Sequence, residues 1–156
     1  MKLIWGIVAM AITTSTALAQ AGGVDHYSAA QLKQMAQKLE QQESFRTTGS
    51  AFETLETYPG SFTMLSVRNK TGSSELHEHY GDIFFVLDGE ATLTSGGTMV
   101  EPKTTEPGEV RGSAVSGGAD QRLGKGDVVH IPPNTPHQIS IPNGKTFSYF
   151  VVKVKE

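Results

Sequence analysis

The sequence of 156 residues contains no cysteine. This absence excludes disulfide scaffolds, thiolate zinc sites and cysteine nucleophiles. Any metal ion must therefore be held by nitrogen and oxygen ligands. Hydrophobic residues make up 37% of the chain, which is ordinary for a globular protein and sufficient for the core of one domain.

A cluster of basic residues is also missing. Asp and Glu number 16 against 13 Lys and Arg, which gives a net charge of −3. Lys145, Lys153 and Lys155 near the C-terminus are too sparse to follow a phosphate backbone. We therefore expect no nucleic-acid partner.

No hydrophobic run is long enough to cross a bilayer, but residues 1–19 have the pattern of a secretory signal peptide. Lys2 supplies a positive start, residues 3–12 are apolar, and Ala17-Leu18-Ala19 is a small-x-small cleavage site. The apolar stretch has about half the length of a membrane span. We expect cleavage after Ala19, with Ala21 as the second choice, and a secreted or periplasmic protein without a membrane span.

After a linker over residues 20–27, an N-terminal helix is predicted over residues 28–45. Ser28 and Gln31 have the spacing of a capping box, which marks a helix start. One apolar stripe follows at helical spacing, formed by Leu32, Met35, Ala36 and Leu39. The stripe packs either against the protein's own domain or against a second copy, so a homodimer is one of two alternatives.

Residues 50–156 show no helical periodicity, and we expect them to form a barrel domain. Short alternating runs are separated by Gly, Pro and Asn about every ten residues, which is typical of an all-β sandwich or barrel. The predicted strands cover residues 61–68, 75–79, 82–87, 91–94, 109–115, 127–131, 137–141 and 146–154. The polar excursion over residues 98–116 is expected to form an extra hairpin or a loop over the barrel mouth.

Four of the five histidines lie in two short segments. His77 and His79 are one residue apart on a predicted strand, so both leave the same face and form half of a metal site. Asp82 follows, and Gly81 permits a bend that turns its carboxylate toward them. His137 opens a strand whose alternate residues are apolar, where a histidine is costly unless something binds it.

These two segments resemble the two motifs of the cupin superfamily. The first cupin motif reads Gly, five residues, His-x-His, three or four residues, Glu, six residues, Gly. Its counterparts here are Gly72, His77-Glu78-His79, Asp82 and Gly89, with the gap after Gly72 and the gap before Asp82 each one residue short and Asp in place of Glu.

The second cupin motif reads Gly, five residues, Pro-x-Gly, two residues, His, three residues, Asn. It corresponds to Gly126, Pro132-Pro133-Asn134, His137 and then Ile141 in place of Asn. The two motifs occur in order, and the resemblance covers roughly residues 60–154. Together they are more specific than either motif alone.

The resemblance implies an all-β, double-stranded β-helix (cupin or jelly-roll) barrel with a short N-terminal α-helix and a divalent transition metal inside. Carried over position by position, the ligands are His77, His79, Asp82 and His137. Asp82 has an alternative role, in which it hydrogen-bonds a ligand histidine and orients its ring. Nitrogen and oxygen donors suit Mn, Fe, Ni, Cu, Co or Zn without distinguishing among them.

The cupin resemblance also implies a reaction on a small polar molecule, such as dioxygenation, decarboxylation or isomerisation. Beyond the ligands only weak candidates for a general acid or base are present, Tyr80 and His130 first among them. A cupin that binds a small ligand or a metal without turnover is therefore the alternative. A third hypothesis is an interaction protein that works through its N-terminal helix. Arg111 is either a surface charge or a cavity group for a substrate carboxylate.

Overall fold

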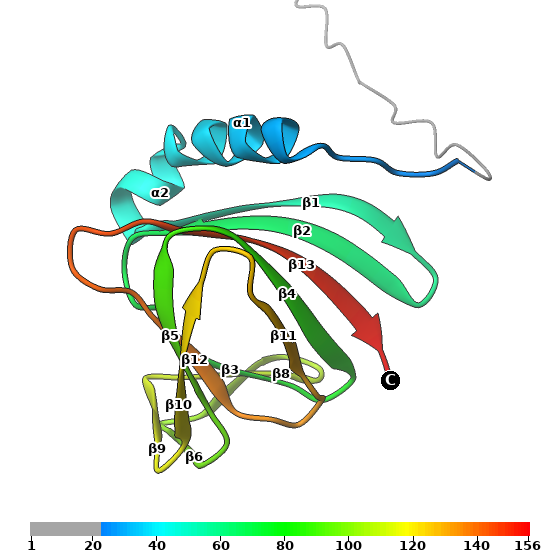
Figure 1. Ribbon diagram of the computed structural model, residues 1–156. Coiled ribbons are helices and arrows are strands. Elements are labelled where there is room, and N and C mark those ends of the chain that lie inside the picture. Colours follow the sequence, from blue (N-terminus) through cyan, green and yellow to red (C-terminus); the bar gives the residue numbers. More distant parts are fainter. Residues whose placement is uncertain (1–22) are drawn as a thin grey trace, which may run out of the picture.

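The computed structural model describes residues 23–156 of the chain (Figure 1). The predicted signal peptide, its cleavage sites and the first residues of the predicted linker lie outside the described residues. Within the described part, no helix combines the length and the apolar character needed to cross a membrane.

Two helices precede the first strand, α1 (Ala29–Glu40) and α2 (Glu43–Thr48). The Ser28 side chain accepts a hydrogen bond from the Gln31 amide, and the Gln31 side chain accepts one from the Ser28 amide, so the predicted capping box is present. The single helix predicted over residues 28–45 is divided, because Gln42 adopts extended φ and ψ angles of −70° and 150°.

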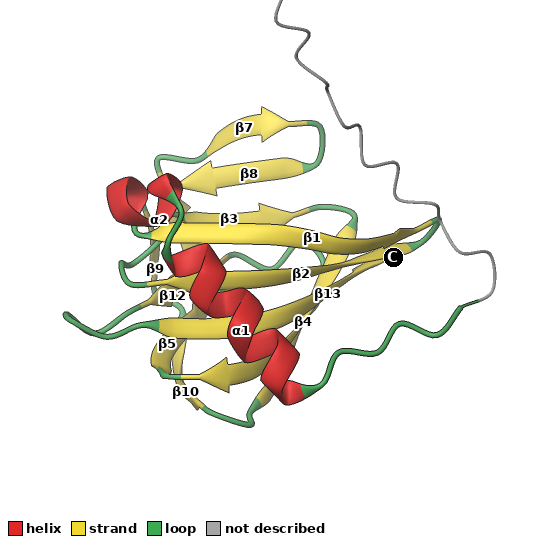
Figure 2. Ribbon diagram, turned by 90° about the horizontal axis from the view of Figure 1, so that it is seen from above, coloured by secondary structure: helices red, strands yellow, loops and turns green. Residues whose placement is uncertain are grey.

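The apolar stripe of α1 packs on the outer face of a sheet of the same chain. Ala36 and Leu39 are buried against Leu65 and Val67 of that sheet, and Phe45 of α2 joins the same cluster. Figure 2 shows α1 lying across the strands. Of the two predicted alternatives for this stripe, the structure shows the intramolecular one.

The strands form two larger antiparallel sheets and one short ribbon. The strands are β1 (Ser50–Tyr58), β2 (Ser61–Arg68), β3 (Ser74–His77), β4 (Tyr80–Asp88), β5 (Glu90–Ser95), β6 (Thr98–Val100), β7 (Lys103–Glu106), β8 (Glu109–Gly112), β9 (Ala114–Ser116), β10 (Ala119–Gly124), β11 (Val128–Ile131), β12 (His137–Ser140) and β13 (Phe147–Lys155). The first sheet has the order β1-β2-β13-β4-β11, and the second has the order β10-β5-β12-β3-β8-β7. The ribbon pairs β6 with β9.

The two larger sheets face each other around one apolar core. Phe84 and Tyr149 contribute from the first sheet, and Leu93 and Ile139 contribute from the second. Toward one end of this interior the side chains are mostly polar, and a cavity opens there. The prediction of an all-β barrel with a short N-terminal helix is confirmed.

The predicted strands differ from the observed ones in several places. β1 and β10 were not predicted, and the strand predicted over residues 75–79 ends at His77. The strand predicted over residues 109–115 is divided into β8 and β9, which belong to different sheets. The polar excursion over residues 98–116 forms the hairpin β7–β8 together with the β6–β9 ribbon, in agreement with the predicted extra hairpin.

Leu39 is 1% exposed, so its replacement tests whether α1 belongs to the fold. We expect Leu39→Ala to lower the free energy of unfolding by about 2–5 kcal/mol, because it leaves a cavity in a packed cluster. Urea unfolding measures this loss. The exposed neighbour Lys38→Ala is the control, with a change of less than about 0.5 kcal/mol. An unchanged stability of Leu39→Ala would contradict the intramolecular role of α1.

Candidate metal centre

Strand register brings polar residues from three strands of the second sheet onto one interior face. Glu75 on β3 lies opposite His137 on β12 and opposite Arg111 on β8. Two pairs further along, and thus on the same face, His77 lies opposite Glu109. Because directly opposed residues of antiparallel strands project to the same side, all five side chains gather there.

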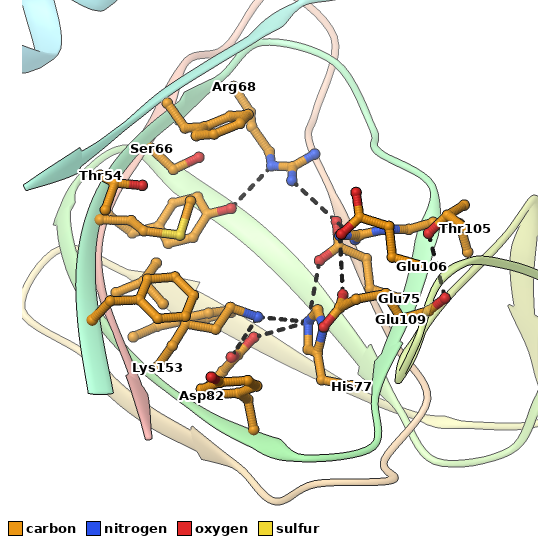
Figure 3. Close-up of a pocket in the computed structure, with 18 residues that line it drawn as sticks. Thr54, Ser66, Arg68, Glu75, His77, Asp82, Thr105, Glu106, Glu109 and Lys153 are labelled. Carbon is orange, nitrogen blue, oxygen red and sulfur yellow. Dashed lines mark hydrogen bonds and ion pairs between the residues drawn. The ribbon is translucent and has the colours of Figure 1, made fainter. Parts of the chain in front are cut away.

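The first sheet supplies two further charged groups. Asp82 on β4 lies opposite Lys153 on β13, and their side chains form an ion pair of 2.7 Å between Oδ1 and Nζ. The exposed fractions of the two side chains are 2% and 12%. Figure 3 shows Lys153 and Asp82 both directed at His77 of the facing sheet.

Glu75, His77 and His137 form a group whose ligand atoms all lie within 4.8 Å of one another. Oε2 of Glu75 is 3.6 Å from Nε2 of His77 and 4.0 Å from Nε2 of His137. Asp82 Oδ2 is 3.4 Å and 3.7 Å from the same two nitrogens. Ligand atoms that share one ion at bond lengths of about 2.1 Å lie roughly 3–3.5 Å apart, so the group needs only small shifts to close on a metal.

A contact at Nδ1 orients the imidazole ring of each histidine. Nδ1 of His77 is 2.7 Å from Oε2 of Glu109, and Nδ1 of His137 is 3.0 Å from the carbonyl oxygen of Thr135. These acceptors take the proton on Nδ1, so Nε2 is the nitrogen through which each ring can bind a metal once that nitrogen is unprotonated. Within residues 23–156, the buried Nε2 of His137 has no hydrogen-bond partner. These donors fit a divalent metal.

The two carboxylates are ionised because cations neighbour them. Burial raises the pKa of Glu75, but a hydrogen bond with His77 and the charges of Arg111 and Arg68 outweigh it and hold this pKa well below its usual range. Both arginines contact Oε1 of Glu75, which leaves Oε2 for the histidines. Burial likewise raises the pKa of Asp82, and the hydrogen bond with His77 and the charge of Lys153 lower it overall.

The two histidines differ in protonation. Burial lowers the pKa of His77, but hydrogen bonds with Asp82 and Glu75 raise it overall to about 9 against the opposing charge of Lys153. The 2.7 Å contact between Lys153 Nζ and His77 Nε2 leaves room for one proton between the two nitrogens. Burial lowers the pKa of His137, which keeps that imidazole neutral and its lone pair available.

A cavity of about 650 Å³ opens beside this group, within the range of small-molecule sites. The first sheet lines it mainly with apolar side chains, whereas β3 and the β7–β8 hairpin line it with polar ones (Figure 3). The apolar wall includes Phe62, Met64, Phe84, Tyr149 and Val151, and the polar wall includes Glu75, His77, Thr105, Glu106, Glu109 and Arg111. Arg111 is therefore a cavity group rather than an ordinary surface charge.

Of the four predicted ligands, the structure brings together His77, Asp82 and His137. The side chain of His79 is 63% exposed, and its nearest charged neighbour is the carboxylate of Glu78 at 4.0 Å. β3 ends at His77, so the alternation that was expected to place His79 on the same face does not reach it. The structure therefore does not place His79 with the other three.

Of the two predicted candidates for acid or base chemistry, the structure places one at the cavity and one in solvent. Tyr80 lines the cavity and contacts the ring of Phe62 edge-on, with 5.6 Å between ring centroids. His130 is 56% exposed and lies 3.7 Å from the carboxylate of Glu156. Tyr80 thus has access to the cavity, whereas His130 faces solvent.

Glu75 and Lys153 were not among the predicted site residues. With Glu75 and His77 in the two histidine positions of the first cupin motif, four residues separate His77 from Asp82 and six separate Asp82 from Gly89, as in the motif. The short gap before Asp82 disappears in this alignment. The sequence does contain a sign of the role of Lys153. Tyr149, Val151 and Lys153 are alternate residues of one strand, so they share a face, and that face points inward.

The paired carboxylates predict a loss of stability in acid. The pKa values of Glu75 and Asp82 are lower in the folded protein than in the unfolded chain, so their contribution is present above about pH 4 and is lost as the pH falls further. His77, with a raised pKa, keeps its contribution throughout that range.

Urea unfolding of the metal-free protein between pH 7 and pH 3 measures this loss, and Glu75→Gln should make it smaller. Exposed Glu101→Gln is the matched control and should keep the full loss. An acid profile of Glu75→Gln that equals the wild-type profile would contradict the assignment.

Comparison with known proteins gives the fold. No protein-family model and no curated protein sequence matches the chain. Among solved structures, it is similar to the cupin domain of Schizosaccharomyces pombe Cnp3, with a TM-score of 0.52 and 13% identity over 69% of this chain and 65% of that one. It is also similar to the DMSP lyase DddQ of Ruegeria pomeroyi, with a TM-score of 0.52 and 18% identity over 76% of this chain and 53% of that one.

KdgF from a Halomonas species has a TM-score of 0.50 and 14% identity over 70% of this chain and 82% of that one. The chain thus spans 65% of the Cnp3 domain and 53% of the lyase. Structural similarity at such low sequence identity shows the fold alone and gives no information about the substrate. In agreement with the two sequence motifs, this chain has the double-stranded β-helix fold of the cupin superfamily.

Proposed function

We propose that this protein is a metal-dependent cupin that acts on a small molecule bound between its two sheets. The observation that carries the proposal is the convergence of Glu75, His77 and His137 to within 4.8 Å, beside a cavity of about 650 Å³. The unpartnered Nε2 of His137, within the described residues, supports it further. A buried polar atom of this kind costs free energy unless something binds it.

In this proposal Glu75 Oε2 and the Nε2 atoms of His77 and His137 hold the ion, and Asp82 Oδ2 lies close enough to join them. The ion would supply Lewis-acid or oxygen-activating chemistry. Glu109 and the Thr135 carbonyl hold the two imidazoles in the required orientation.

The cavity walls indicate the kind of substrate. Phe62, Met64 and Val151 offer an apolar surface to the body of a small molecule. The opposite wall is polar, and oxygens of a carboxylate, phenol or enediol are suitable ligands for positions on the ion that the protein leaves open. Tyr80 lines the same cavity, where its hydroxyl is available for proton transfer. The proposed reaction is therefore of the lyase, isomerase or dioxygenase type.

The metal content of purified variants tests this proposal. We expect about one divalent ion per chain in protein prepared without a metal-binding tag, measured by mass spectrometry. His77→Ala, His137→Ala and Glu75→Gln should each lower metal affinity by more than the 10–100-fold typical of residues that only orient a ligand. His79→Ala is the matched control, because its exposed ring should leave metal content unchanged.

Three results would overturn the proposal or its ligand set. A folded wild-type protein that takes up no divalent metal would exclude metal dependence. If His79→Ala lost the ion and Glu75→Gln kept it, the ligands would be those of the motif alignment that starts at His77. Retained metal in both His77→Ala and His137→Ala would place the ion elsewhere.

We also propose that the chain is exported and cleaved after Ala19, which its N-terminal charge and hydropathy pattern supports. Expression in a bacterial host followed by intact-mass analysis should show a periplasmic protein that begins at Gln20. Ala17→Arg should block this cleavage, because the site requires small residues. Recovery of the full-length wild-type chain from the cytoplasm alone would contradict export.

A further inference from the structure

Lys153 lies where a cation would sit between two of the candidate ligands. Its Nζ is 2.7 Å from Nε2 of His77 and 2.7 Å from Oδ1 of Asp82 (Figure 3). The Lys153 side chain is 12% exposed, and Asp82 is 2% exposed. A nitrogen atom and a carboxylate oxygen thus face one buried cationic group, and that group belongs to the chain itself.

The ammonium and a metal ion would have to occupy the same place. Nδ1 of His77 contacts Glu109, so Nε2 is the nitrogen that remains for a bond to a metal. Nε2 lies 2.7 Å from Nζ of Lys153. An ion bound to Nε2 at about 2.1 Å would also lie close to the ammonium, where two like charges repel strongly because little water screens them. The metal and the observed position of Lys153 therefore exclude each other.

The cavity offers Lys153 another position. Lys153 lines this cavity, and Glu106 and Glu109 line its polar wall. A lysine has a flexible four-carbon stem, so its ammonium can turn away from His77 while the backbone of β13 stays in place. The ammonium can thus leave the donor group and remain near carboxylates.

We propose that Lys153 is a built-in competitor of the metal ion. In the metal-free protein its ammonium pairs with Asp82 and His77, and a divalent ion enters only by displacing it into the cavity. The inference rests on the proposed metal function and adds a means by which the chain regulates its own loading. It implies that the native protein binds metal more weakly than its ligand set allows.

The affinity for Zn²⁺ tests this inference without any activity measurement. Metal-free wild type and Lys153→Met are titrated with Zn²⁺ at pH 7 in competition with a chelator, since methionine keeps the length of the stem and removes the charge. We expect Lys153→Met to bind at least tenfold more tightly. Lys155→Met is the matched control, because it removes one exposed charge from the same strand and should leave the affinity unchanged.

Thermal unfolding supplies a second measurement. Metal-free Lys153→Met should unfold at a lower temperature than the wild type, because Asp82 loses its buried cation. Saturating Zn²⁺ should raise its midpoint by more than it raises the wild-type midpoint. If Lys153→Met does not fold without metal, the comparison is made between Asp82→Asn and Lys153→Met/Asp82→Asn, in which no buried carboxylate is left unpaired at that position.

The outcomes separate this inference from the proposed function. If wild type binds Zn²⁺ and Lys153→Met binds it equally or less tightly, Lys153 is not a competitor, whereas the metal function stands. If only Lys153→Met binds, and His137→Ala removes that binding, the competition is supported and the native protein is not metal-dependent. If neither protein binds Zn²⁺, the proposed function fails and this inference fails with it.

Discussion

The register of β3 against its two neighbours is the constraint on which the candidate site depends. It sets Glu75 between His137 and Arg111, and it sets His77 opposite Glu109. A shift of one residue would turn every side chain of β3 to the other face of the sheet. Glu75 and His77 would then leave the cavity, and Ser74 and Leu76 would take their place. Hence the pairing of three short strands determines both the donor set and the hydrogen bonds that orient it.

Charge balance then explains how so polar a group is accommodated next to an apolar core. Each buried carboxylate has a cation on its own sheet: Glu75 has Arg111, and Asp82 has Lys153. Arg68 reaches Glu75 from the facing sheet. Removing one partner of such a pair is costly because an uncompensated charge stays buried. The metal-free site is thus electrostatically complete through its own side chains, which is why Lys153 is central to how the site takes up an ion.

The N-terminal helices allow the first sheet to carry this site. Along β2, Leu65 and Val67 face α1 and α2, whereas Ser66 and Arg68 face the cavity. Both faces of β2 are therefore covered. The strand alternation of period two separates the two roles, because adjacent residues point in opposite directions. The helices stabilise the wall of the cavity without supplying a residue to it.

The sequence by itself determined the fold class, the capping of α1, and the presence of His77, Asp82 and His137 in two motifs of recognisable spacing. Tertiary structure decided the rest of the site. Whether β3 stops at His77 depends on its pairing with β8, and this end point separates exposed His79 from inward-facing Glu75. Lys153 is distant from the motifs along the chain and meets His77 only because β13 pairs with β4 and the two sheets face each other. Alternation along one strand predicts which residues share a face, but it contains no information about which strands lie opposite that face.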